Sequence, residues 1–358
     1  MPIRYLLIIL TVVCVTSACS QQEKPNPETA ETMHETTDSE QGFKVIAQNL
    51  DEPWEIVKNG EAIYISERTG SIVKIQDGEK NRMPVELSAD LSNQPEAGLL
   101  GIAFPDNFSE TRTAYAYYSY QENEKYYQRV VIIQAKNTKW TEMEILLDKI
   151  PGGTFHQGGR IEIGPDNKLY ITTGDATTPE LAQDKGSLAG KILRVNIDGS
   201  VPEDNPFTDS YVYSYGHRNP QGLAWNEDNQ LYATEHGSSA HDEINRIIKG
   251  ENYGWPAIRG DETEADMKEP VIHSGSDTWA PSGMTFFNGD FYFASLAGEG
   301  LRRFDPENKE QELVVSDVGR VRDALAADNG IYFITNNTDG RGKPAEKDDR
   351  LLFISKLN

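Results

Sequence analysis

The sequence predicts an all-β fold, a six-bladed β-propeller, because one strand–turn–strand pattern recurs along the chain and no long helical pattern competes with it. In each copy an apolar strand is followed by a turn of Asn, Asp or Gly and then by a second strand that contains tyrosine. The six copies recur about every 40–60 residues, the spacing of propeller blades. They span residues 51–75, 98–120, 160–175, 222–237, 282–304 and 323–340.

Third strands follow some of these copies, as in AGKILRVNIDG (189–199) and GLRRFD (300–305). A parallel α/β fold would need helices between its strands, and the sequence between the copies does not supply them. Closing the sheets into a ring would also remove exposed strand edges. We therefore expect one propeller domain over residues 43–358.

The first 42 residues are expected to lie outside this domain. Residues 1–18 have one basic residue, a short apolar run and small residues before Cys19, the layout of an export signal. The stretch TSAC resembles a bacterial lipobox, which predicts a lipid-bearing Cys19 as membrane anchor in the cell envelope; an ordinary secretory signal cut nearby is the alternative. Residues 19–42 are rich in Glu, Thr, Pro, Gln and Ser, which predicts a disordered tether.

Composition excludes several function classes. The formal net charge is −23, and an acidic surface of this size argues against nucleic acid as a partner. Of the two cysteines, Cys14 lies inside the predicted signal and Cys19 at its end. The mature domain then has no disulfide and no thiol nucleophile, so any catalysis must use other groups.

A glycine-rich loop before one predicted strand carries His156, in GGTFHQGGR. In a propeller, loops that enter corresponding strands of different blades gather on one face around the central channel. The stretches HRNPQ (217–221) and RVR (320–322) occupy the same place in their copies. We therefore expect His156 and these two stretches to converge on one mouth; the alternative is a loop histidine without a function.

The two other stretches carry donors for an anion. Arg218 offers a fixed fork of N–H groups for a carboxylate or a quinone oxygen. Arg320 and Arg322 lie two residues apart on a predicted strand, so both side chains point the same way. In an acidic protein this pattern suggests a ligand with several carboxylates, while a hydrogen-bonded turn and surface salt bridges remain the alternatives.

A third stretch, ATEHGSSAHDEINRIIKGENYGWP (233–256), combines a Gly-Ser-Ser loop with carboxylates. Backbone carbonyls and carboxylates suit a hard cation such as calcium, although solvated acids are an equal alternative for Asp242 and Glu243. The chain has neither an HExxH zinc motif nor a GxSxG nucleophile elbow.

Taken together, PW, GLLGIAF, HQGGRIEIGPDNKLYITTGD, GKILRVNIDGS, YGHRNPQGLAW, DEINRIIKGENYGWP and RVRD resemble the soluble PQQ-dependent sugar dehydrogenases. This is the family of soluble glucose dehydrogenase and aldose sugar dehydrogenase, and the resemblance spans about residues 45–355. It implies an aldose substrate oxidised to its lactone, PQQ and calcium as cofactors, and an electron acceptor that the sequence does not identify.

The resemblance also implies roles for individual residues. His156 matches the general base, Asp175 an acid that supports it, and Arg218 the residue beside the reactive carbonyl of the quinone. Contacts to the cofactor are implied for Glu96, Asn219, Gln221, Arg320 and Arg322. The carbonyls of Gly237 and Ser238 match ligands of the calcium that holds PQQ, and Glu243 with the carbonyl of Tyr253 resembles part of a second, structural calcium site.

Two positions depart from the family pattern. Glu96 stands where glucose dehydrogenase has glutamine, and Ala297 stands where a cofactor-binding lysine is expected, with Arg302 and Arg303 as conceivable substitutes. The loss of this lysine favours a second reading, a non-redox propeller that binds a carbohydrate or a protein partner. A calcium-dependent lactone hydrolase is a third reading, which the arginine-rich mouth disfavours.

Overall fold

The structure is a computed structural model, and it describes residues 42–355 and residue 357. The predicted export signal, Cys19 with its lipid, and the tether up to residue 41 lie outside these residues. Within the described part of the chain, no helix is both long enough and apolar enough to cross a membrane. Residues 42–355 contain two short helices, α1 (Phe108–Thr111) and the 3₁₀ helix η1 (Pro179–Ala182).

The strands form six groups of four, each an antiparallel sheet. The first two groups are β2 (Pro53–Asn59), β3 (Ala62–Glu67), β4 (Ser71–Gln76), β5 (Glu79–Glu86), and β6 (Leu99–Ala103), β7 (Thr113–Glu122), β8 (Lys125–Lys136), β9 (Lys139–Pro151). The next two are β10 (Ile161–Ile163), β11 (Lys168–Thr173), β12 (Lys191–Asn196), β13 (Val212–Tyr215), and β14 (Pro220–Trp225), β15 (Leu231–Glu235), β16 (Glu243–Arg246), β17 (Ile272–His273). The last two are β18 (Pro281–Phe287), β19 (Asp290–Ser295), β20 (Gly300–Asp305), β21 (Glu310–Val315), and β22 (Val321–Ala327), β23 (Gly330–Thr335), β24 (Leu351–Ile354), β1 (Phe43–Ala47).

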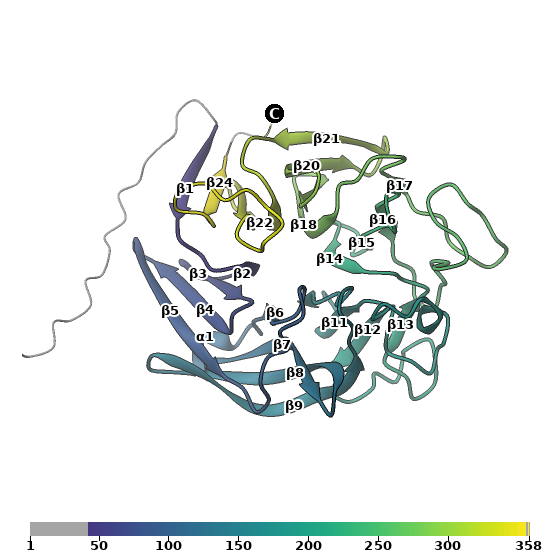
Figure 1. The fold of residues 1–358 in the computed structure, drawn as a ribbon, viewed down its shortest axis with the longest axis horizontal. Helices are drawn as coiled ribbons and strands as arrows, with labels where there is room; N and C mark the ends of the chain where they lie inside the picture. Colours follow the sequence, from purple (N-terminus) through teal and green to yellow (C-terminus); the bar gives the residue numbers. More distant parts are fainter. Residues whose placement is uncertain (1–41, 356, 358) are drawn as a thin grey trace, which may run out of the picture. The chain divides into compact units, whose positions relative to one another are not determined.

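These groups are the blades of a ring (Figure 1). The leading strands contact their neighbours around the centre: β2 with β6, β6 with β10, β14 with β18, β18 with β22, and β22 with β2. The third blade meets the fourth through β11 and β14. The predicted six-bladed propeller is therefore confirmed.

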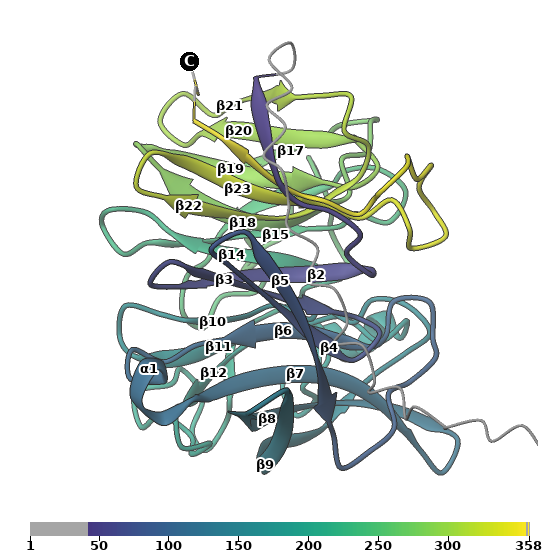
Figure 2. The same ribbon diagram turned by 90° about the vertical axis from the view of Figure 1, so that its left-hand side faces the viewer.

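Two features of the ring go beyond the repeat pattern. The first and second blades are joined at their outer edge by a short parallel pairing of β5 with β9, which makes one eight-stranded sheet (Figures 1 and 2). The last blade combines both ends of the folded chain, because β1 pairs antiparallel with β24, Phe43 opposite Ile354. This pairing closes the ring.

The strands form where apolar residues can be buried between neighbouring blades. In β3 every residue of AIYISE is buried, and the core cluster around Ile65 joins side chains of the first blade to Ile334 and Leu351 of the last. Turn residues set the register of the hairpins: Asp77 and Gly78, between β4 and β5, both have positive φ, 54° and 76°. A two-residue turn of this kind matches the right-handed twist of the flanking strands.

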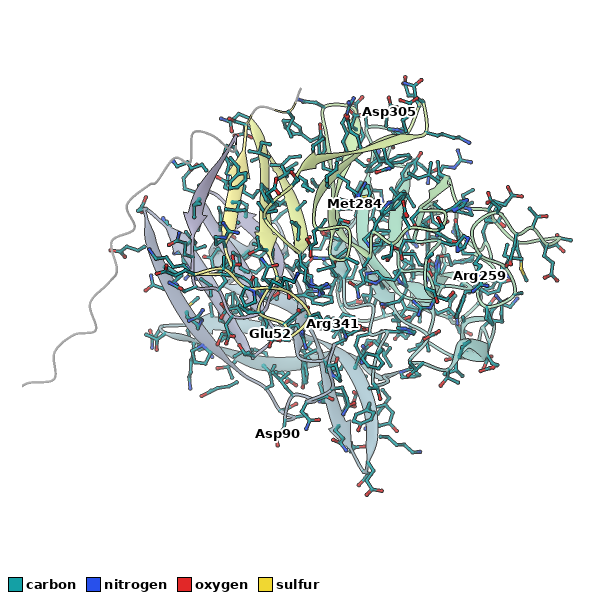
Figure 3. All side chains as sticks on the ribbon, turned by 45° about the horizontal axis from the view of Figure 1, so that its top comes forward. Glu52, Asp90, Arg259, Met284, Asp305 and Arg341 are labelled. Atoms are coloured by element: carbon teal, nitrogen blue, oxygen red, sulfur yellow. The ribbon has the colours of Figure 1, made fainter. Side chains whose placement is uncertain are left out.

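The centre of the ring is charged. Arg160 is 1% exposed, and its Nη1 lies 3.1 Å from Oε1 of Glu55 and 3.2 Å from Oδ1 of Asp323. Glu162, on β10, is the third carboxyl near this guanidinium, and burial raises its pKa to about 7. A cavity of about 330 Å³ lies next to these carboxyls. It is lined by Glu162, Asp323 and Glu227 together with apolar side chains such as Met284 (labelled in Figure 3).

Candidate active site

His156 lies in the loop between β9 and β10, at the end of the ring where the leading strands begin. Its backbone is in the left-handed region (φ 62°), and its N–H donates to Oε2 of Glu96 at 2.8 Å. Gly174 makes room for this conformation, because a Cβ at that position would lie 1.8 Å from the carbonyl oxygen of His156. A side chain at position 174 is therefore incompatible with this arrangement of the loop.

The imidazole of His156 is held from both sides. Its Nδ1 lies 2.7 Å from Oδ1 of Asp175, and its Nε2 lies 2.9 Å from Nη2 of Arg218. Arg218 can only donate, so Nε2 is the unprotonated nitrogen and Nδ1 carries the proton toward Asp175. With its side chain 19% exposed, His156 presents a basic nitrogen at the mouth of the ring.

Asp175, two residues after the end of β11, is fully buried. Its Oδ1 also accepts the backbone N–H of Thr177 at 2.8 Å, and its Oδ2 accepts the indole N–H of Trp255 at 2.9 Å. A buried carboxylate costs free energy unless it is hydrogen-bonded, and these donors satisfy both oxygens. The carboxylate is thus fixed in place to orient His156.

Arg218, just before β14, is the other neighbour of His156. Its Nη1 donates to the carbonyl of His236 at 3.1 Å, and its backbone N–H donates to Glu235. Burial lowers the pKa of Arg218. Its Nε is buried without a hydrogen-bond partner. The guanidinium therefore has donor capacity left for a bound group.

Arg320 and Arg322 lie at the start of β22, and their charges are not balanced within the protein. Nη2 of Arg320 pairs with Asp339 at 2.9 Å, and the same carboxylate lies 3.9 Å from Arg322. Arg322 donates from Nη1 to Oε1 of Gln221 at 2.9 Å, while its Nε is buried without a partner. Burial and the charge of Arg320 lower the pKa of Arg322 to about 9.

The expected convergence of His156 with the stretches 217–221 and 320–322 is confirmed by these contacts and by Asn219. Oδ1 of Asn219 accepts the N–H of Gly158 at 2.9 Å, which ties the His156 loop to β14. Glu96 belongs to the same cluster, but both of its oxygens have partners within the chain. Oε2 accepts from His156 N, and Oε1 pairs with Arg341 (labelled in Figure 3) at 2.9 Å.

The residues expected to bind the first calcium lie in the loop after β15, next to Arg218. Asp242 shapes this loop: its Oδ1 accepts the N–H of Gly237 at 2.7 Å, and its Oδ2 accepts the backbone N–H groups of Trp279 and Ala280. The hydroxyl of Ser238 accepts from Arg259. Asp242, expected from the sequence as a solvated acid or a ligand, is instead a buried acceptor of four hydrogen bonds.

The second expected calcium site includes Glu243, the first residue of β16, which follows this loop in the chain. Burial and the neighbouring charge of Glu235 raise the pKa of Glu243 to about 7. Both carboxylates are within reach of Nδ2 of Asn245, at 3.4 Å and 3.1 Å. The hydroxyl of Tyr253 donates to the carbonyl of Arg246. Among residues 42–355, no three His, Cys, Asp or Glu side chains gather as a metal site, so calcium here would depend on backbone carbonyls as well.

Arg302 and Arg303, the conceivable substitutes for the missing lysine, have partners within the protein, although Nε of Arg302 is buried without one. Arg303 pairs with Asp290 at 2.7 Å and with Glu312 at 3.0 Å. Arg302 donates to Gln311 at 2.7 Å. Both arginines are thus held by partners on neighbouring strands.

Sequence reasoning assigned no role to four residues that shape this site, although all but Asp339 lie in the stretch 233–256 that it singled out for calcium. They are Trp255, Asp339, Glu235, and His236, whose Nε2 is buried without a partner and whose pKa burial lowers to about 4. Asp339 lies four residues after β23 and Asp175 two residues after β11, so an aspartate soon after a second strand was a usable signal. No comparable signal marks Trp255.

Known proteins resemble this chain in sequence and in fold. The glucose/sorbosone dehydrogenase family matches residues 50–346. The PQQ-bound aldose sugar dehydrogenase of Streptomyces coelicolor is 34% identical with a TM-score of 0.81, covering 86% of this chain and 95% of that one.

Two further relatives carry names of the same kind. Quinoprotein glucose dehydrogenase B of Acinetobacter calcoaceticus is 34% identical over 61% of this chain, and the match covers 52% of that protein. Aldose sugar dehydrogenase YliI of Escherichia coli is 28% identical over 83% of this chain and 90% of its own length. The match across 297 residues and the shared fold confirm the resemblance drawn from the motifs. The chain belongs to the glucose/sorbosone dehydrogenase family, a family of quinoprotein sugar dehydrogenases.

Proposed function

We propose that this protein is a PQQ- and calcium-dependent aldose dehydrogenase that oxidises the anomeric hydroxyl of a sugar to the lactone, with His156 as general base. The observation that carries the proposal is the arrangement of His156 between Asp175 and Arg218, with its unprotonated Nε2 at the mouth of the ring. A base and a cation side by side suit removal of a proton from a group that loses hydride.

The mouth fits an anionic cofactor. Arg218, Arg320 and Arg322 bring three guanidiniums there, and the buried Nε atoms of Arg218 and Arg322 lack partners. The lowered pKa of Arg322 indicates that its charge is under-compensated, which a ligand carboxylate would relieve. Arg320, Arg322, Gln221 and Asn219 would hold PQQ, and PQQ when bound supplies the acceptor for hydride from the sugar.

Calcium fits as a partner of that cofactor through backbone oxygens. The Gly237–Ser238 segment is fixed by Asp242, and its carbonyls are the kind of oxygen ligand that calcium takes. At the second expected site, a cation between Glu235 and Glu243 would relieve the repulsion that raises the pKa of Glu243. Glu243 and the carbonyl of Tyr253 would then serve as ligands.

The chain's own residues perform three tasks in this reaction. His156 Nε2 accepts the proton of the anomeric hydroxyl once the sugar has displaced Nη2 of Arg218, which donates to this nitrogen in the structure. Asp175 stabilises the imidazolium that forms, because its Oδ1 accepts from Nδ1 at 2.7 Å. Arg218 stabilises negative charge that develops beside it, since its Nε is a buried donor without a partner.

A calorimetric titration of PQQ into calcium-loaded protein tests the proposal, with wild type beside His156→Ala. We expect both proteins to bind PQQ and only wild type to reduce a dye when an aldose is added. His34→Ala is the matched control, because His34 precedes the propeller domain in the sequence and its replacement should leave activity unchanged. No binding to either protein would refute the proposal and leave a non-redox propeller as the better reading.

We also propose that the protein is exported and held at the membrane by a lipid on Cys19. The support is the signal-like composition of residues 1–18. Labelling of growing cells with a radioactive fatty acid should mark the wild-type protein and not Cys19→Ser. An unlabelled wild-type protein of the cleaved size would point to an ordinary secretory signal instead.

A further inference from the structure

We infer that Trp255 is a positioning residue of this site, because its indole contacts both groups that flank His156. The inference rests on the proposed function, since it assigns Trp255 the task of orienting Asp175 and Arg218, the two neighbours of the base His156. Trp255 belongs to the long segment between β16 and β17, far from His156 in the sequence, and nothing in the motifs assigned it a role.

The first contact is with Asp175. Oδ1 of this carboxylate is shared by His156 Nδ1 and the N–H of Thr177, whereas Oδ2 accepts from the indole Nε1–H of Trp255 at 2.9 Å. Within the described residues, the indole is the sole hydrogen-bond donor to Oδ2. Since Asp175 is fully buried, no water can easily replace this donor.

The second contact is with Arg218. Its guanidinium carbon lies 5.4 Å from the centroid of the Trp255 ring, within the range of a cation–π interaction. The same guanidinium reaches His156 Nε2 at 2.9 Å. One indole therefore fixes the acid on the Nδ1 side of the imidazole and the cation on its Nε2 side.

Trp255 is itself held from two directions. Its backbone N–H donates to the carbonyl of Gly216 at 2.9 Å, and its carbonyl accepts from Nε2 of Gln183 at 2.7 Å. The amide of Gln183 also pairs with that of Asn252, with contacts of 2.9 and 3.0 Å. A residue anchored on both sides in this way can impose an orientation on its neighbours.

Removing the indole N–H has a directional consequence. In Trp255→Phe the aromatic ring still supports Arg218, but Oδ2 of Asp175 is left buried and unpaired. The charge of Asp175 is then less dispersed and holds the protonated form of His156 more strongly. The acid limb of the pH–rate profile should move to higher pH, and the less firmly oriented base should lower kcat.

The test compares wild type with Trp255→Phe and with Trp225→Phe, the same replacement on β14 beside the cavity. With calcium, PQQ and a saturating aldose, we expect a kcat for Trp255→Phe about tenfold lower, with less than a twofold change in KM and unchanged PQQ binding. Trp225→Phe should behave as wild type. Superimposable pH profiles and equal kcat in Trp255→Phe and wild type would overturn the inference, whereas inactive wild type would count against the proposed function instead.

A second measurement applies even if Trp255→Phe does not fold. The chain has five tryptophans, so ¹⁵N-tryptophan labelling gives a small set of indole N–H resonances. Asp175→Asn should shift one of them clearly, because it changes the acceptor at 2.9 Å. Five unshifted indole resonances would show that the indole does not bind Asp175, and the inference would fail.

Discussion

Replacing Glu162 by glutamine is expected to stabilise the protein at alkaline pH and not at acid pH. Glu162 shares the single guanidinium of Arg160 with Glu55 and Asp323, so the centre of the ring holds three carboxyls and one cation. Burial raises the pKa of Glu162 from 4.5 to about 7, with Asp323 adding to the effect and Arg160 opposing it. Glutamine keeps the size of the side chain and removes its charge.

The magnitude follows from linkage. Between pH 4.5 and 7 the folded protein holds a proton on Glu162 that the unfolded chain has released, so stability falls as pH rises through this window. A difference of 2.5 between the two pKa values corresponds to about 3 kcal/mol. Because Glu162 lines a cavity, solvent screening reduces this figure, and we expect about 1–2 kcal/mol at pH 8.

Urea denaturation at pH 5 and pH 8 measures this effect. Glu162→Gln should exceed wild type in unfolding free energy at pH 8, and the gap should narrow at pH 5. Glu227→Gln is the matched control, since Glu227 lines the same cavity but is exposed. An equal gain in both variants would reveal a general effect of the net charge of −23, and no gain in Glu162→Gln would refute the reasoning.

Three further outcomes are expected. Gly174→Ala, whose Cβ would meet the carbonyl oxygen of His156 at 1.8 Å, should lower kcat about a hundredfold or more, measured by dye reduction. Asp242→Asn should lower the unfolding free energy in urea by about 2–3 kcal/mol, because the carboxylate accepts four hydrogen bonds while 3% exposed. Adding calcium to chelator-treated protein should raise its Tm, if the oxygens around Gly237, Ser238 and Glu243 bind the ion; an unchanged Tm would contradict those ligands.

Much of the fold could be predicted because propeller blades repeat one local pattern. Tyrosine-containing second strands, such as β11 and β15, fall inside the predicted copies, and turn residues mark their hairpins. The parallel seam between β5 and β9 could not be foreseen, since it depends on two outer strands meeting across different blades. The closure by β1 has the same cause: its partner β24 lies at the far end of the chain.

In the candidate site too, residues that belong to the repeat pattern could be predicted and residues outside it could not. His156 and Arg218, 62 residues apart, could be brought together from the sequence because both precede a leading strand. The contact of Trp255 with Asp175 spans 80 residues and joins a strand end to a segment without any repeat pattern. The position of Trp255 depends on the tertiary packing of the long segment between β16 and β17, which a local sequence pattern does not determine.

The pairing of β1 with β24 has a consequence for how the protein is made. About 310 residues separate Phe43 from Ile354, and bringing such distant segments together costs about 5 kcal/mol of chain entropy. On the ribosome, the last blade cannot be completed until the C-terminal strand has emerged. Until then β23 presents an unpaired edge, so a stalled or truncated chain would be prone to aggregation, and its survival would depend on chaperones.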